Sequence, residues 1–235
     1  MYNSLSKFLA QAGVASRRKV VDIIKSGVVT VNNTVVKEPG FKISSHDTIH
    51  VNGQIVTREP KIYILLNKPK NCITTVADEH DRHHVLDLLG DEIQQRVYPI
   101  GRLDRDTTGL LLLTNDGNLT LKLSHPRYEI EKAYLVTLDK ALTHKDIQKL
   151  CDGIALEDGF TRVDNAYFLK NSSKKECVVE LHSGKNRIVR RLFEHLGYNV
   201  VKLDRIGYAG LTKTGLSIGQ WRYLTHAEIT HLKKK

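Results

Sequence analysis

Two pairs of turn-forming residues near the N-terminus most strongly constrain what this chain can fold into. Asn32-Asn33 and Asn52-Gly53 each lie between short runs rich in β-branched residues, over residues 28–36 and 49–56. Asn and Gly tolerate the positive φ angles that two-residue hairpin turns require. The sequence therefore predicts two small β-hairpins, and the Asn-Gly pair is the stronger of the two signals.

Two short helices are expected ahead of these hairpins. Apolar residues recur at helical spacing over residues 5–12 and stop at Gly13, a residue suited to ending a helix. A second helix is expected to begin after Ser16, whose hydroxyl suits an N-cap, and to end at Gly27. Three cations open this second helix: Arg17, Arg18 and Lys19. A helix N-terminus favours bound anions, so these cations require an explanation.

The pattern of the sequence changes at residue 60. The helices and hairpins over residues 1–60 make one compact unit, and Arg58-Glu59-Pro60 has the composition of a boundary. Residues 61–235 mix strand-like and helix-like segments instead. The strand-like runs lie near residues 62–65, 110–114, 134–138 and 178–181. The helical patterns lie at residues 119–124, 145–150 and 189–196. We therefore expect two domains, 1–60 and 61–235, the second mixing sheet and helix.

Charge and composition narrow the class of function. The 36 basic and 26 acidic side chains give 235 residues a net charge of +10, which attracts polyanions such as nucleic acids. An apolar fraction of 40% supports a packed core and excludes a disordered tail protein. The apolar runs are far shorter than the ~20 residues that span a bilayer, and the first twenty residues lack a secretory pattern. We expect a cytoplasmic protein with no membrane partner.

No metal site is expected. The three cysteines include no C-x-x-C pair, which argues against a disulfide framework and a zinc knuckle. The adjacent residues His83 and His84 are expected to point apart and to lack a third ligand.

The densest group of charged and hydroxyl residues lies at positions 99–117, directly before an apolar run. Asp104 and Asp106 there match the D-x-D-x-T spacing of aspartate-nucleophile phosphohydrolases. That motif follows an apolar strand, whereas here the apolar run comes after it, and no acidic pair suited to magnesium follows downstream. Phosphohydrolase chemistry is therefore the weaker interpretation. A turn-capping role for either aspartate remains an open alternative on these residues alone.

The stretch GRLDRDTTGLLLLTNDG, residues 101–117, resembles the catalytic motif of pseudouridine synthases that modify ribosomal RNA, a group that includes the small-subunit enzyme and its large-subunit relatives. The resemblance covers nearly the whole chain, and the joint order of its motifs is more specific than any one of them. The other matching segments are an S4 RNA-binding domain at 5–33, a strand at 65–70, a tyrosine motif at 131–136, a third motif at 183–198, and closing segments at 203–211 and 219–225. Asn71 and Ile188 stand where the family often has Gly and Gln.

The resemblance implies an α+β chain: a small S4 domain of the αL type, then a catalytic domain with a mixed, largely antiparallel sheet flanked by helices. It implies an isomerase, an intramolecular transferase, that converts uridine to pseudouridine in ribosomal RNA, with the large subunit as the expected carrier. The reaction involves no redox change and needs no cofactor. The expected partner of this monomer is ribosomal RNA or an assembling ribosomal particle. The rival interpretation is a noncatalytic RNA-binding assembly factor on the same scaffold.

By the same resemblance, Asp104 is the catalytic carboxylate. It can add to carbon 6 of uracil, attack carbon 1 of the ribose, or act in an elimination that gives a glycal, and the sequence does not choose among these routes. A carboxylate in a dry pocket keeps its charge only beside a cation. The resemblance assigns that cation to Arg190, which we favour over Arg187. Tyr134 offers a face for stacking a flipped base and a phenol near carbon 5.

Contacts to RNA are expected from cations in both domains. Arg102 is expected to fill the space that a flipped uridine leaves, or to contact its phosphate. The side chains expected to bind RNA are Arg17, Arg18, Lys19, Arg102, Lys185 and Arg187. Phosphate contacts position a protein on RNA without reading its sequence.

Overall fold

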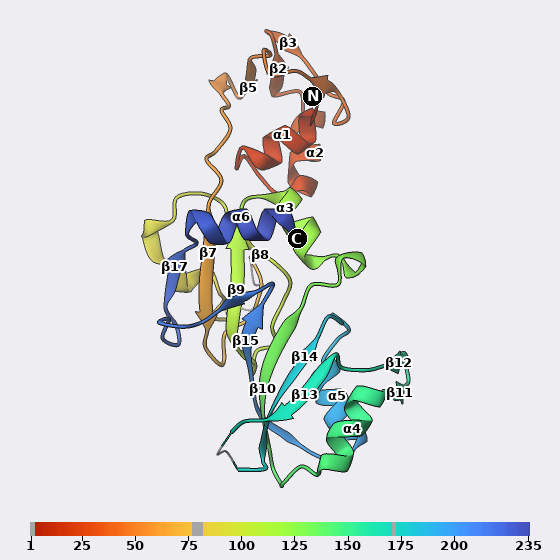
Figure 1. Ribbon diagram of the computed structural model, residues 1–235. Coiled ribbons are helices and arrows are strands. Elements are labelled where there is room, and N and C mark those ends of the chain that lie inside the picture. The colour runs from red at the N-terminus through yellow and green to blue at the C-terminus, as the bar shows by residue number, and fades with distance from the viewer. Residues whose placement is uncertain (1–2, 77–81, 171–172) are drawn as a thin grey trace. The chain divides into compact units, whose positions relative to one another are not determined.

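The computed structural model describes residues 3–76, 82–170 and 173–235 (Figure 1). The chain divides into two compact units. The first comprises Met1–Ile62 with the short pieces Gln94–Arg96 and Asn115–Gly117, and the second comprises the rest. Each unit has a hydrophobic core of its own.

The first unit contains both predicted helices. Helix α1 (Leu5–Gln11) is capped by Ser4, and helix α2 (Arg17–Lys25) is capped by Ser16, whose Oγ accepts a hydrogen bond from the Lys19 N–H at 3.3 Å. An N-cap hydroxyl satisfies a backbone donor that has no partner within the helix. The apolar faces of the two helices supply much of the unit's core, and the side chains of Leu5, Leu9, Val20 and Ile24 are fully buried.

Both predicted hairpins are confirmed. Asn32, Asn33, Asn52 and Gly53 all have positive φ, between 50° and 77°, as the hairpin turns require. The strands are β2 (Val29–Val31), β3 (Thr34–Val35), β5 (Ile49–Val51) and β6 (Gln54–Ile55), and β2 pairs with β5 to give the sheet order β3-β2-β5-β6. Two further short strands, β1 (Asn3–Ser4) and β4 (Lys42–Ile43), pair with each other.

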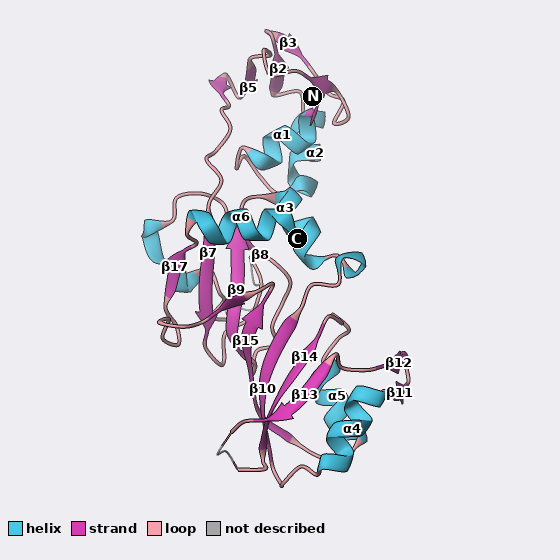
Figure 2. Cartoon of the chain, viewed as in Figure 1, coloured by secondary structure: helices cyan, strands magenta, loops and turns pink. Residues whose placement is uncertain are grey.

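The second unit is built on one mixed sheet, which has nine strands in the described residues (Figure 2). Its order is β13-β14-β10-β15-β9-β7-β17, with β8 added to β9 and β16 added to β15. Only the β9/β15 pairing is parallel among the described strands, so the expected mixed, largely antiparallel sheet is confirmed. The strands are β7 (Tyr63–Lys68), β8 (Tyr98–Pro99), β9 (Thr108–Thr114), β10 (Lys132–Leu138), β13 (Asn165–Phe168), β14 (Glu176–Leu181), β15 (Val200–Tyr208), β16 (Leu211–Thr212) and β17 (Trp221–Tyr223).

Helices pack on this sheet around two apolar clusters. Helices α4 and α5 contribute to a cluster with β10 and β14, whereas α3 and α6 contribute to a cluster with β7 and β9. The helices are η1 (Asp87–Glu92), α3 (Gly117–Ser124), η2 (Pro126–Tyr128), α4 (His144–Asp152), α5 (Ile188–His195) and α6 (His226–Lys234). A separate small hairpin joins β11 (Ile154–Leu156) to β12 (Gly159–Thr161). None of the helices in the described residues has the length and apolar character needed to cross a bilayer.

The parallel contact between β9 and β15 depends on a glycine. Gly109 has φ +105°, and a Cβ built on it would lie 2.3 Å from the backbone oxygen of Arg205. No other residue allows so close an approach of two backbones at this φ. This contact places the middle of the 101–117 motif, at Thr108 and Gly109, beside β15.

One detail near η1 differs from expectation. The Nδ1 atoms of His83 and His84 lie 3.1 and 3.0 Å from the carboxylate of Asp87, so the two rings approach one side chain and the expectation that they point apart is wrong. The chain turns at this point, because the Asp87 N–H donates to the His84 carbonyl oxygen at 3.1 Å. That turn brings the carboxylate back toward both rings.

Candidate active site

Asp104 lies in the loop that joins β8 to β9. The Thr107 N–H donates to the Asp104 carbonyl oxygen at 3.1 Å and closes a turn directly before the strand. Leu103 anchors the loop on its other side: it is buried, its N–H donates to Thr74 Oγ1 at 3.2 Å, and its carbonyl oxygen accepts from the same hydroxyl at 2.8 Å. The Asp104 carboxylate is thus held between two fixed points and remains 35% exposed.

Lys68 supports the same loop and was not identified from the sequence. Its side chain is fully buried, and its Nζ donates to the carbonyl oxygens of Pro69, Cys72 and Arg105 at 2.8, 2.7 and 3.3 Å. Burial lowers the pKa of the Lys68 ammonium group to about 8. Asn71 also donates its N–H to the Arg105 carbonyl at 3.0 Å, and its φ of +60° explains why the family often has Gly there.

The buried ammonium predicts a pH-dependent contribution to stability. The pKa of Lys68 is about 8 in the folded protein, compared with an ordinary value of 10.5. Between these two pH values the folded protein releases the proton and the unfolded chain keeps it, so the free energy of unfolding rises with pH. Between about pH 7.5 and 9.5, the free energy of unfolding of the wild type is expected to rise by on the order of 1–2 kcal/mol relative to that of Lys68→Met, as measured by urea unfolding. Lys70→Met, at an exposed site, is the control for removal of a lysine. If wild type and Lys68→Met differed in free energy of unfolding by the same amount at every pH, the prediction would be wrong.

A cavity of about 210 Å³ opens beside the Asp104 loop. Among the residues that the structure describes, its lining combines a single carboxylate, that of Asp104, with several cations and two tyrosines. The residues that matter here are Arg102, Asp104, Thr107, Lys132, Tyr134, Lys185, Arg187, Arg205 and Tyr208. This balance of charge suits an anionic ligand such as a nucleotide.

Arg187 is the cation that lies against Asp104. Its Nη1 is 3.4 Å from Asp104 Oδ2, and the side chains are 46% and 35% exposed. Arg190, the expected partner, instead donates from Nη1 to the Val200 carbonyl oxygen at 2.9 Å and is only 9% exposed. The difference arises because α5 begins at Ile188. Arg187 precedes the helix with φ 47°, so it does not share the helical face of Arg190.

Tyr134 lies in β10 and faces the same cavity. The register between β10 and β15 shifts at Tyr134, which is paired with Arg205 across the strands. A bulge of this kind turns a side chain out of the regular alternation of a strand. Tyr134 is half-buried against the apolar cluster of β10, β14, α4 and α5, with a face available in the cavity.

Two buried donors in the cavity lining were not identified as functional from the sequence. Thr107 Oγ1 and Arg205 Nη2 are buried, and neither has a hydrogen-bond partner among the described residues. Arg205 is held in place because its Nε donates to the Leu110 carbonyl at 2.7 Å and its guanidinium lies 4.5 Å from the ring centre of Tyr208. Buried polar groups normally have partners, so these two are suited to the oxygens of a bound molecule.

Lys132 adds a further cation to the lining. Its Nζ donates to the carbonyl oxygens of Ile130 and His182 at 2.8 and 2.7 Å. Burial, together with the nearby Arg205 charge, lowers the pKa of Lys132 to about 8.

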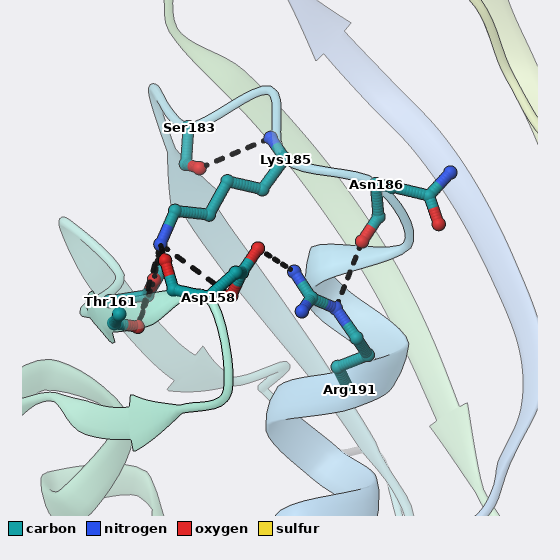
Figure 3. Close-up of polar contacts among 7 residues, drawn as sticks. Asp158, Thr161, Ser183, Lys185, Asn186 and Arg191 are labelled. Atoms are coloured by element: carbon teal, nitrogen blue, oxygen red, sulfur yellow. Dashed lines mark hydrogen bonds and ion pairs between the residues drawn. The ribbon is translucent and has the colours of Figure 1, made fainter.

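The cations expected to bind RNA have different surroundings. Arg102 is exposed at the cavity, and Arg17, Arg18 and Lys19 are exposed in the first turn of α2. Lys185, in contrast, donates its Nζ to Thr161 Oγ1 at 2.9 Å and to the Asp158 carbonyl at 3.1 Å (Figure 3). Its ammonium group is therefore engaged within the protein.

Comparisons with known proteins show which family this chain resembles. Residues 62–195 match the RNA pseudouridylate synthase family, and residues 4–49 match the S4 domain. A Bacillus subtilis protein named ribosomal large subunit pseudouridine synthase B is 46% identical, over 97% of this chain and 95% of its own length. The Escherichia coli dual-specificity RNA pseudouridine synthase RluF is 35% identical, over 98% of this chain and 78% of its own length.

A solved structure agrees as well. A crystal structure of a pseudouridylate synthase superposes with a TM-score of 0.69 at 29% identity, covering 97% of this chain and 99% of that one. The sequence relatives and the solved structure are thus all named as pseudouridine or pseudouridylate synthases. The chain belongs to the RNA pseudouridylate synthase family and carries an N-terminal S4 domain.

Proposed function

We propose that this protein converts uridine to pseudouridine in ribosomal RNA of the large subunit, with Asp104 as the catalytic carboxylate. The observation that carries the proposal is a cavity in which Asp104 is the sole carboxylate among the described lining residues, is paired with Arg187, and shares the lining with Tyr134. The 46% identity to the protein named for the large subunit supports the choice of substrate.

The chemistry requires one bond to break and one to form at the same ribose carbon. The bond from nitrogen 1 of uracil to carbon 1 of the ribose breaks, the uracil turns, and carbon 5 bonds the ribose before losing its proton. Asp104 assists by addition to carbon 6, by attack on the ribose, or by elimination to a glycal. Arg187 lies against the carboxylate with its Nη1 3.4 Å from Asp104 Oδ2. Tyr134 stacks on a uridine flipped out of its helix, a step that costs about a few kcal/mol.

The C5 proton provides a direct assay. Because the new bond replaces the hydrogen on carbon 5, RNA carrying tritium at that carbon releases tritiated water once per conversion. Large-subunit RNA is expected to release tritium with the purified protein, and small-subunit RNA is the control. Mapping of pseudouridines in cells with and without the gene identifies the position. Tight RNA binding with no tritium release, and no missing pseudouridine, would favour the noncatalytic assembly factor.

We further propose that residues 1–60 capture RNA and that residues 61–235 catalyse the reaction. The protein is expected to act in the cytoplasm as a monomer, on RNA or on an assembling particle. Arg17, Arg18 and Lys19 support the assignment of capture to the first domain, since they are exposed where the amides of α2 also favour anions.

Replacement of Arg17, Arg18 and Lys19 by Gln is expected to weaken RNA binding and flatten its salt dependence. Removing one phosphate contact reduces the slope of log affinity against log salt by roughly 0.7 to 0.9, so the slope for the triple variant should fall by about 2. Filter binding across a salt series measures both quantities. The matched control replaces Lys25, Lys37 and Lys42, which are exposed in the same unit. Equal effects in the two triple variants would assign the result to net charge instead of to the start of α2.

A further inference from the structure

The β11–β12 hairpin carries an aspartate that joins two cations of the third motif. Asp158 lies in the hairpin turn, before Gly159, whose φ of +104° suits glycine. Its Oδ2 is 2.9 Å from Arg191 Nη2, and its backbone oxygen accepts from Lys185 Nζ at 3.1 Å. Figure 3 shows both cations reaching toward the hairpin turn, one from the loop before α5 and one from α5 itself.

These contacts fix both ends of the segment that runs from Lys185 to Arg191. Lys185 Nζ also donates to Thr161 Oγ1 at 2.9 Å and lies 3.7 Å from Asp158 Oδ1. Arg191 Nε donates to the Asn186 carbonyl oxygen at 2.9 Å, so a single guanidinium bonds both the hairpin and the loop. The hydrogen bond from Arg191 lowers the pKa of the Asp158 carboxyl group below its ordinary value.

Arg187 lies in the middle of this segment. Its φ of 47° and ψ of 30° are left-handed, a conformation that costs a non-glycine residue about 1–3 kcal/mol and persists only where the surroundings impose it. The same residue places its Nη1 3.4 Å from Asp104. The contacts of Asp158 with Lys185 and Arg191 restrain the backbone on both sides of Arg187.

We propose that Asp158 is a positioning residue for uridine isomerisation: by holding Lys185 and Arg191, it keeps Arg187 in the conformation that faces Asp104. The inference rests on the proposed function, because its readout is the rate of pseudouridine formation. It assigns the charges of Lys185 and Arg191 to holding this loop instead of to RNA.

The test compares Asp158→Asn with Glu157→Gln. Both substitutions remove one negative charge from the same hairpin turn, and Glu157 lies close enough to Arg191 to favour its charged form, yet no hydrogen bond of its side chain is found among the described residues. In Asp158→Asn, the single-turnover rate at saturating RNA is expected to fall about tenfold. RNA affinity is expected to stay equal or to increase by up to about threefold, since the Arg191 guanidinium loses its carboxylate partner and becomes available to phosphates. Lys185 keeps its hydrogen bonds to the Asp158 carbonyl oxygen and to Thr161 Oγ1. Glu157→Gln is expected to retain the wild-type rate.

A lower rate together with an unchanged or higher RNA affinity distinguishes a positioning role from other roles. A general loss of folding lowers the active fraction and the unfolding temperature, which fluorescence and thermal melts detect. If Asp158→Asn does not fold, Arg191→Lys takes its place: it keeps the charge but does not bond the hairpin and Asn186 together, and the same tenfold decrease is expected. Equal rates in Asp158→Asn and Glu157→Gln would overturn the inference, and so would weaker RNA binding at an unchanged saturated rate. Absence of tritium release by the wild type would instead refute the proposed function.

Discussion

Asp104→Asn is expected to abolish pseudouridine formation, with a decrease of at least about a thousandfold in single-turnover rate. The amide has the shape of the carboxylate but lacks its negative charge and its nucleophilic oxygen. RNA affinity is expected to stay within about threefold of wild type, because phosphate contacts dominate affinity. Tritium release from RNA labelled at carbon 5 measures the rate, and filter binding measures the affinity.

Asp106→Asn is the matched control. Asp106 lies in the same loop, two residues away, and is exposed. It is expected to retain most of the wild-type activity, since the cavity lining includes Asp104 but not Asp106. Substantial turnover by Asp104→Asn would contradict the assignment of the catalytic carboxylate. Inactivity of both variants, together with a requirement for magnesium, would instead support the D-x-D phosphohydrolase interpretation.

The sequence correctly predicted the elements whose formation depends only on residues adjacent in the chain. The hairpins at Asn32-Asn33 and Asn52-Gly53 and the N-cap at Ser16 need only a few adjacent side chains, and each lies where it was expected. Turn and cap chemistry is local, so a single sequence carries it. The family resemblance then supplied the sheet type, which local signals do not determine.

The contacts missed from the sequence join distant segments. Lys68 ends an apolar strand, and nothing near it in the sequence indicates that the Arg105 carbonyl will accept its hydrogen bond. Likewise, Lys185 has the sequence pattern of an RNA-binding cation, and only the fold brings Asp158 and Thr161 beside it. The pattern of charged residues along the chain predicts the sign of the surface charge. It does not reveal which charges are already satisfied within the protein, because that depends on the tertiary arrangement.

In the structure Arg187, and not Arg190, lies against Asp104. The spacing of three residues would place both arginines on one helical side only if the helix included position 187. The left-handed φ of Arg187 places this residue before the helix, which begins at Ile188, and its side chain contacts Asp104. Arg190 lies within the helix and is buried beside Val200, where its guanidinium contacts a backbone oxygen. The assignment of Arg190 to catalysis stays a prediction, to be decided by substitution.

Arg187→Met and Arg190→Met are therefore expected to affect different quantities. Met preserves much of the apolar length of Arg and removes the charge. In Arg187→Met, Asp104 no longer has its cation, and the saturated rate is expected to fall on the order of 10- to 100-fold with little change in the unfolding temperature, because the side chain is about half exposed. In Arg190→Met, a buried hydrogen bond to the Val200 carbonyl is removed, and stability is expected to fall by about 1–3 kcal/mol.

Rates at saturating RNA, measured below the unfolding temperature of both variants, separate the two arginines. A greater decrease of rate in folded Arg190→Met than in Arg187→Met would reverse the assignment. It would mean that RNA binding rearranges the segment over residues 185–191 and brings Arg190 to Asp104. In that case Asp158→Asn would also be expected to lower the rate through Arg190, and the double variant Asp158→Asn with Arg187→Met would be slower than Arg187→Met alone. If Arg187 is the cation that Asp158 positions, the second substitution causes no further decrease, because both act through the same pair, Arg187 and Asp104.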